Sequence, residues 1–201
     1  GVNLIRNGYI GEVKEIKVAI GAPYKACDLP GQPIPENIDW NAWIGPAPYR
    51  GYHYDLACPI DDKRWGMWRD YTPFGGGMIT DWGAHMFDIV QWALDMDHTG
   101  PLHFTPPGGV TTEGLTYTYE NRIKVTHTKW GSGNNEIQFI GTEGRLEISR
   151  GYLKTFPDAS LAKKPLRESD TNRVYNSPNH HEDWLDAIKK RTRPICDVEV
   201  G

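Results

Sequence analysis

The clearest periodic pattern in the sequence runs from Met78 to Leu94, directly after three consecutive glycines at 75–77. Apolar residues recur there at the 3.6-residue spacing of an α-helix, which predicts an amphipathic helix with its apolar side against a core. The opposite side of this helix carries Asp81, His85, Asp88 and Trp92. We expect the other elements of the chain to be arranged around this helix.

Short β-rich segments dominate the second half of the chain. Apolar and polar residues alternate along them, and Gly, Asn and Ser turns separate them, which predicts a series of antiparallel hairpins. A further strand is predicted at 13–20, where Lys14 and Lys17 are interpreted as a solvated sheet edge. The hairpin strands are predicted at 115–119, 122–130, 136–140, 145–149 and 152–156.

Two other segments complete the predicted fold. Residues 21–64 contain seven prolines, which exclude long regular elements, but their tryptophans and tyrosines indicate an ordered excursion with a function. A last helix is predicted to begin with Ser177 as N-cap and to end at Arg191. The sequence therefore predicts one α+β domain over residues 1–201, with an open, mostly antiparallel sheet and helices packed on one face.

Composition narrows the classes of function. The 201 residues are 38% hydrophobic and 24% charged, as in an ordinary globular domain. The net charge of -4 and the lack of a dense Lys/Arg run argue against nucleic acid, and no apolar stretch is long enough to span a bilayer. The three widely spaced cysteines predict free thiols, with neither a disulfide framework nor a zinc site.

The polar side of the central helix carries candidate chemistry. Asp81 and His85 stand at i and i+4, where the carboxylate could bond the imidazole, fix its tautomer and raise its pKa, as a proton-transfer histidine requires. The spacing leaves a second interpretation open, in which Asp81, His85 and Asp88 are only the solvated side of an amphipathic helix.

Candidate binding residues lie just before that helix. The rings of Trp65 and Trp68 with the guanidinium of Arg69 suit a sugar, which has apolar faces and a rim of hydroxyl groups. The alternative places the tryptophans in a core and pairs Arg69 with Asp70 or Asp81.

The glycine run and the last helix offer weaker candidates. Gly76 and Gly77 could direct backbone N–H groups at a cofactor, or could serve only tight packing against a missing domain. His181 could face a binding cleft, although a structural role is the more common one, and no further ligands suggest a metal there.

Four motifs occur in the order and spacing of one known family. They are 40-WNAWIGPAP-48, 65-WGMWRD-70, the glycines at 75–77 with the Asp81, Gly83, His85 and Asp88 pattern, and the last helix from His181 to Pro194. Over nearly its whole length the chain resembles the C-terminal domain of the glucose-fructose oxidoreductase, inositol dehydrogenase and rhizopine-catabolism (Gfo/Idh/MocA) oxidoreductases.

The resemblance implies a function and a cofactor. Relatives join an N-terminal Rossmann domain, which binds NAD or NADP, to an α+β domain like this one. Asp81 and His85 match the family's catalytic Asp and His, of which the His exchanges a proton with the sugar or polyol hydroxyl being oxidised. The resemblance therefore implies the substrate domain of a bacterial NAD(P)-dependent sugar or polyol dehydrogenase, associating as a homo-oligomer through its sheet.

The chain departs from full-length relatives in ways that limit this expectation. It has no Glu-Lys-Pro motif and no G-x-G-x-x-G turn after a strand, so the isolated chain is expected to bind no dinucleotide and to be inactive. Two alternatives stay open: an NAD-dependent glycosidase of the same family, and a carbohydrate-binding or oligomerisation module without catalysis. We expect the protein to be located in the bacterial cytoplasm, or in the periplasm if an export signal has been removed.

Overall fold

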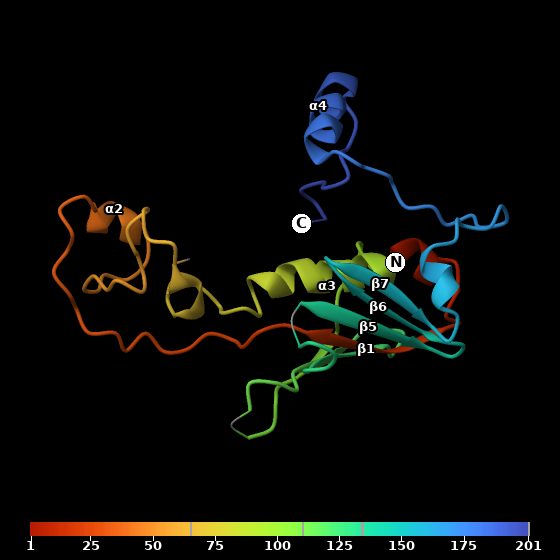
Figure 1. Cartoon of the computed structure of the whole chain (residues 1–201), viewed down its shortest axis with the longest axis horizontal. Coiled ribbons are helices and arrows are strands. Elements are labelled where there is room, and N and C mark those ends of the chain that lie inside the picture. Colours follow the sequence, from red (N-terminus) through yellow and green to blue (C-terminus); the bar gives the residue numbers. More distant parts are fainter. Residues whose placement is uncertain (65, 110, 134, 201) are drawn as a thin grey trace.

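The chain forms one seven-stranded sheet with helices on one face and a long arm at one end (Figure 1). The computed structural model describes residues 1–64, 66–109, 111–133 and 135–200. The strand order is β2-β3-β4-β1-β5-β6-β7, and every neighbouring pair is antiparallel except β1 and β4. The predicted α+β class is confirmed. The strands are β1 (Val13–Ala19), β2 (His103–Thr105), β3 (Thr116–Thr118), β4 (Lys124–His127), β5 (Glu136–Gly141), β6 (Arg145–Ser149) and β7 (Tyr152–Phe156).

Strand β1 occupies the centre of the sheet, between β4 and β5. The interpretation of Lys14 and Lys17 as a sheet edge is therefore wrong. An alternating pattern is equally typical of an edge strand and of a central strand with one open face, so it could not decide the position. By inserting here, β1 divides the predicted series of hairpins into two groups, β2-β3-β4 and β5-β6-β7.

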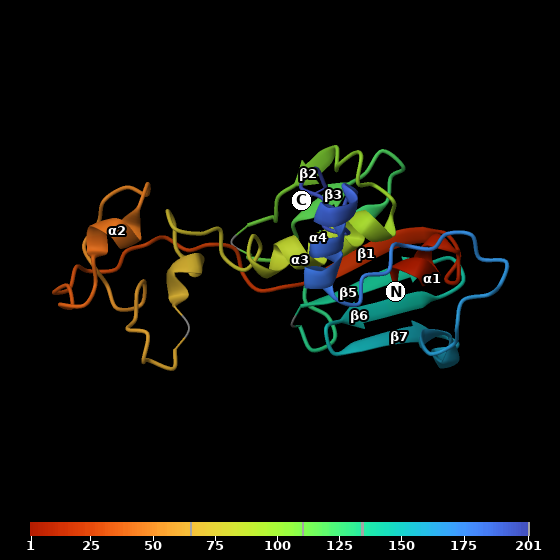
Figure 2. The ribbon, with the colours of Figure 1, turned by 90° about the horizontal axis from the view of Figure 1, so that it is seen from above.

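The inner face of the sheet carries the main core. Ile16 of β1 pairs with Val125 of β4 and Phe139 of β5, and these three side chains are fully buried. Helices α1 (Val2–Arg6) and α3 (Trp82–Ala93) lie over this face, as Figure 2 shows from above. The side of α3 that meets the core carries Gly83, Met86, Val90 and Ala93.

Helix α3 begins at Trp82, four residues after the predicted start at Met78. The residues just before the helix pair instead with the segment that follows β1. Gly77 forms a bridge with Pro23, and the Met78 N–H donates to the Ala22 carbonyl at 2.9 Å. Asp81 consequently becomes the N-cap residue with non-helical backbone angles, rather than a residue within the helix.

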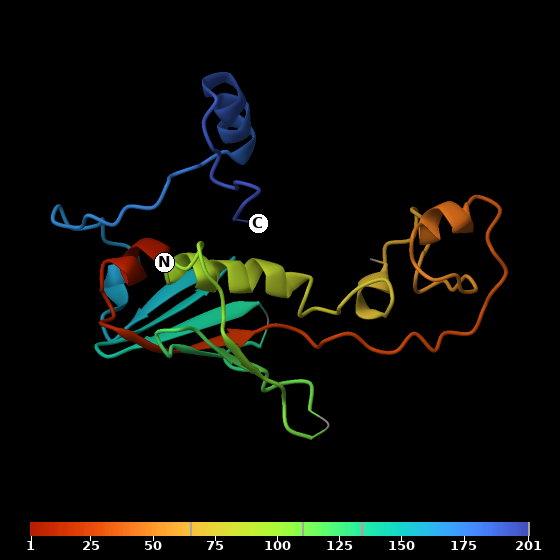
Figure 3. The ribbon, with the colours of Figure 1, turned by 180° about the vertical axis from the view of Figure 1, so that it is seen from behind.

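Residues 21–80, which we call the arm, extend away from the sheet (Figures 1 and 3). The arm contains α2 (Trp40–Ile44) and the 3₁₀-helix η1 (Met67–Asp70), and Asp39 caps α2 by accepting from the Ala42 N–H at 3.0 Å. A core of its own confirms that the segment is ordered, and this core consists of Trp40, Ile44, Tyr52, Leu56, Ala57 and Tyr71.

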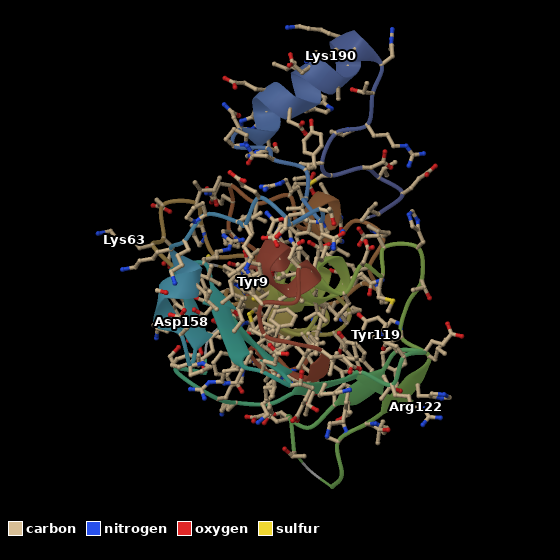
Figure 4. All side chains as sticks on the ribbon, turned by 90° about the vertical axis from the view of Figure 1, so that its right-hand side faces the viewer. Tyr9, Lys63, Tyr119, Arg122, Asp158 and Lys190 are labelled. Carbon is tan, nitrogen blue, oxygen red and sulfur yellow. The ribbon has the colours of Figure 1, made fainter. Side chains whose placement is uncertain are left out.

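Helix α4 (His180–Lys190) stands off the sheet, so the prediction that helices pack on one face holds for α1 and α3 but not for α4. Lys190 at its far end lies well away from Tyr119 and Arg122 of the sheet (Figure 4). The predicted Ser177 N-cap is wrong, because the Asn179 side chain accepts from the N–H groups of His181 and Glu182. Among the described residues, no helix has the length and apolar character needed to cross a bilayer.

The segment between β7 and α4 is mostly loop, as predicted, apart from the 3₁₀-helix η2 (Ala159–Ala162). Its later part is held against α1 and the residues after it. The Tyr9 hydroxyl lies 2.5 Å from the Asp170 carboxylate, and Asn172 donates from its backbone N–H to Asn7 at 3.1 Å. These contacts hold the loop against the body of the domain before the chain rises into α4.

Candidate functional site

The start of α3 is tied to the arm by an ion pair. The Nε atom of Arg69 in η1 lies 2.9 Å from Oδ2 of Asp81, the N-cap residue of α3. The alternative that pairs Arg69 with Asp81 is thus confirmed, whereas its placement of Trp68 in a core is wrong, because Trp68 is exposed. No hydrogen bond joins Asp81 to His85 in the described part of the chain, because Asp81 turns toward the arm from outside the helix. A catalytic role for Asp81 stays a prediction.

His85 lies exposed on α3, with an aromatic ring beside it. The ring centres of Trp82 and His85 are 5.5 Å apart, and the guanidinium carbon of Arg150 lies 4.5 Å from the centre of the Trp82 ring. Arg150 comes from the turn between β6 and β7, so this arrangement, the Arg150–Trp82–His85 stack, joins the helix to the sheet. Sequence reasoning missed Arg150, since nothing near it in the chain indicates that contact.

On its other side His85 borders a cavity of about 710 Å³ between α3 and strands β2 and β3. The cavity combines aromatic walls from Phe104 and Tyr117 with polar groups from Asp88 and Gln91. Such a mixture of apolar faces and a few converging polar groups is typical of a small-molecule site, and it suits a sugar in particular.

A hydrogen-bond network fixes the polar wall of this cavity. The Tyr119 hydroxyl donates to Oε1 of Gln91 at 2.7 Å, and Nε2 of Gln91 donates to the Thr99 carbonyl at 2.5 Å and to that of Met96. Burial raises the pKa of both Tyr117 and Tyr119 above the ordinary tyrosine value, so both hydroxyls stay protonated. Neutral, positioned hydroxyl groups are suited to bind other hydroxyl groups.

Asp88 lies one turn after His85 and shares the cavity wall. Partial burial of its carboxyl group raises the pKa of Asp88, the nearby Asp97 carboxylate raises it further, and His85 opposes the change. The residue as a whole remains exposed. His85 thus affects the pKa of Asp88, and the predicted role of Asp81 toward His85 stays a prediction.

We expect Asp88→Asn to stabilise the protein slightly at neutral pH. A raised pKa means that folding disfavours the ionised carboxyl group, so the wild type loses stability as pH rises from the ordinary aspartate value through the higher folded value. Above that window the variant should melt about one or two degrees higher, and below it the two proteins should melt together. Melting curves from acid to neutral pH check this, and equal melting temperatures throughout would contradict it.

The other predicted binding residues are only partly brought together. Trp65 lies outside the described residues. Trp68 is exposed, with the Arg69 guanidinium carbon 5.4 Å from its ring centre, so these two residues lie together at the base of the arm. His181 lies on α4, its ring centre 4.1 Å from that of His180, and no described contact joins it to His85.

The glycines before α3 serve the packing of the arm. Gly77 has φ +73°, a Cβ there would approach the Pro23 carbonyl carbon to 2.3 Å, and its N–H already donates to the Arg69 carbonyl at 2.8 Å. A Cβ on Gly76 would meet Thr80 Oγ1 at 2.4 Å. Both glycines pack tightly within the arm, so packing against another domain and a cofactor contact of Gly76 or Gly77 both stay predictions.

The part of the chain that the structure describes has no candidate metal cluster and three free cysteines. No group of three or more His, Cys, Asp or Glu side chains there has a metal-binding arrangement. Cys27, Cys58 and Cys196 are free thiols.

The Arg69–Asp81 ion pair predicts coupled mutational effects. Because one interaction holds both side chains, Arg69→Gln and Asp81→Asn should each lower kcat/KM by about tenfold, and the double variant should be little worse than either. A double-mutant cycle on the full-length protein measures this coupling. Additive losses, or a shift of the pH-rate profile in Asp81→Asn but not in Arg69→Gln, would show instead that Asp81 acts on His85.

Comparisons with known proteins show to which family the chain belongs. The chain matches the model of the Gfo/Idh/MocA oxidoreductase family, C-terminal alpha/beta domain, over residues 24–194. It is similar to a solved structure described as "putative oxidoreductase from Thermotoga maritima", at 15% identity and a TM-score of 0.42, a match that covers 99% of this chain and 51% of that one. This similarity says nothing of function, and the chain spans about half the length of that protein. No curated protein matches the chain.

The family match takes in most of the arm, all of α3 and strands β2 to β7, whereas β1 precedes it. His85, Asp81 and the cavity beside α3 all fall within it. The resemblance seen in the sequence motifs is thus confirmed over most of the chain. The chain belongs to the Gfo/Idh/MocA oxidoreductase family and carries that family's C-terminal α/β domain.

Proposed function

We propose that this chain is the substrate-binding domain of an NAD(P)-dependent oxidoreductase that oxidises a hydroxyl group of a sugar, polyol or glycoside. The observation that carries the proposal is the position of His85, exposed on α3 between the Trp82 ring and a cavity lined by aromatic rings and hydroxyl groups. Membership of an oxidoreductase family supports the reaction class.

In this proposal His85 is the general base. Its neutral imidazole accepts the proton of the substrate hydroxyl, and a bound nicotinamide would supply the acceptor for the hydride that leaves the same carbon. Trp82 limits the motion of the imidazole ring on one side, and Asp88 lies in the wall of the same cavity. The Tyr119 and Gln91 pair would hold neighbouring hydroxyl groups of the sugar.

The described residues do not fit a dinucleotide by themselves. Strand β1 leads into the arm rather than into a glycine turn and helix, and the Gly77 N–H is already engaged. We therefore place the cofactor on a separate N-terminal domain, with residues 1–201 as the C-terminal substrate domain. No step of the proton transfer above depends on how that domain binds the dinucleotide.

We also propose that the outer face of the sheet joins two copies of the protein. This face has an ordered polar surface: Gln138 donates to Glu147 at 2.9 Å, Arg145 Nε lies 3.2 Å from the same carboxylate oxygen, and Oγ1 of Thr126 is buried without a partner. Preordered polar groups suit a self-complementary contact. Light scattering on the full-length protein tests this, and a strictly monomeric protein would refute it.

The test of the reaction uses the full-length protein with NAD or NADP and a panel of free sugars, polyols and aryl glycosides. Net formation of the reduced cofactor from a free sugar or polyol would support the dehydrogenase. Release of the aglycone without net change of the cofactor would favour the glycosidase alternative. Saturable sugar binding with no reaction of either kind would favour a binding module.

A further inference from the structure

Arg150 lies near the proposed site, where Trp82 contacts both Arg150 and His85, and no counter-charge for Arg150 occurs among the described residues. The turn between β6 and β7 brings it onto the exposed side of Trp82, where its guanidinium carbon is 4.5 Å from the ring centre. The residue is exposed, and no ion pair of Arg150 occurs among the described residues. It therefore presents its positive charge and its N–H donors to the solvent beside the site.

Two other charged groups of this region are already engaged. Arg69 is neutralised by Asp81 at 2.9 Å. Glu136, whose strand neighbour is Ser149, is only 3% exposed and accepts hydrogen bonds from the backbone N–H and the hydroxyl of Ser132. Arg150 thus differs from Arg69 and Glu136 in keeping its charge available to a ligand, on a chain whose net charge is -4.

The stack also fixes the position of Arg150 relative to the proton-transfer group. Two ring contacts, of 4.5 Å and 5.5 Å, link the guanidinium to the His85 imidazole through Trp82, so the two groups are at most about 10 Å apart. A guanidinium held over an aromatic ring still has N–H donors that can bind a carboxylate or a phosphate. One sugar ring can reach both groups.

We propose that Arg150 binds an anionic group of the substrate, a carboxylate or a phosphate monoester on the sugar whose hydroxyl His85 deprotonates. The proposal rests on the function proposed above and narrows its substrate class to acidic sugars. Trp82 then serves both groups, as a platform for the guanidinium and as a neighbour that limits the motion of the imidazole ring.

The experiment compares wild type, Arg150→Gln and Lys154→Gln in the full-length protein. Lys154 is a matched control, because it is an exposed cation on the same hairpin that lies over Tyr152 at 4.4 Å. The substrates are hexuronates, hexose 6-phosphates and the corresponding neutral hexoses. We measure kcat/KM with NAD or NADP, and we measure Kd for each sugar by calorimetry as a readout that does not require turnover.

The wild-type protein should prefer either the hexuronates or the hexose 6-phosphates to the neutral hexoses. The preferred class shows whether Arg150 binds a carboxylate or a phosphate. Arg150→Gln should lower kcat/KM and affinity for that class by roughly 10- to 100-fold, with little change for the neutral sugar, while Lys154→Gln stays near wild type. Arg150→Lys should recover only part of the loss, since an ammonium cannot form the paired contact.

Three outcomes would overturn the role of Arg150, and the third leaves the proposed function standing. The first is an equal loss for neutral and anionic sugars, and the second is a wild-type preference for the neutral sugar. The third is turnover with no dependence on Arg150, which would remove this inference alone. Conversely, Arg150-dependent binding of an acidic sugar that is never oxidised would support the anion site and overturn the proposed reaction.

Discussion

His85→Ala should lower turnover of the full-length protein by roughly two to four orders of magnitude, the usual contribution of a positioned general base. The imidazole is exposed on α3 beside the substrate cavity, so its removal takes away the proton acceptor without opening the core. Steady-state kinetics on a sugar that the wild type oxidises, with the same cofactor, measure the loss.

The control for this variant is stability. The side of α3 that packs on the sheet carries Met86 and Val90, and His85 lies outside it, so the melting temperature should change by no more than a degree or two. If the Asp81, His85 and Asp88 pattern were only a solvated helix surface, the variant would keep wild-type turnover. That result would end the assignment of His85.

Phe139→Ala should have the largest effect on stability, about 3–5 kcal/mol. Phe139 lies on β5 beside the central strand, is fully buried, and pairs with Ile16 on one side and Leu146 on the other. Truncation leaves a cavity beneath the helices that the sheet cannot easily close. Urea unfolding of the protein, followed by circular dichroism, measures the change in the free energy of unfolding.

Ile140→Ala is the matched control, since the next residue of the same strand points to the outer face and is only partly buried. We expect a loss of about 1 kcal/mol or less for this variant. Equal losses at the two positions would mean that the outer face is as well covered as the inner one. The division of the sheet into a core face and an open face would then be wrong.

The sheet could be predicted to a large extent because its signals are local. A period of two residues and short polar turns place all five hairpin strands within a few residues of their observed bounds. The central place of β1 depends on pairing with β4 and β5, which follow it by more than 100 residues, and no local pattern carries that information. The late start of α3 has the same cause, since Gly77 bridges to Pro23.

The site residues likewise divide into those that local sequence predicts and those that depend on contacts between distant segments. His85 follows from helical spacing and from the family motif, and the structure places it beside a cavity. The ion-pair partner of Asp81 depends on how the arm folds back against the start of α3. From the sequence, Arg69 is that partner in only one of two interpretations. Arg150 reaches Trp82 from a turn 68 positions along the chain, so only the folded sheet reveals the stack. Residues in contact across elements carry no local signature of that contact.

Chemical rescue of His85→Ala by imidazole tests the central claim most directly, that His85 accepts the proton of the substrate hydroxyl. Removing the side chain leaves space beside Trp82 that a small base can enter. We predict that added imidazole restores part of the lost turnover, and that the restored rate rises with pH as imidazole loses its proton, reaching half of its maximum near the pKa of free imidazole. An imidazole-independent residual rate in an intact, substrate-binding variant would contradict that role.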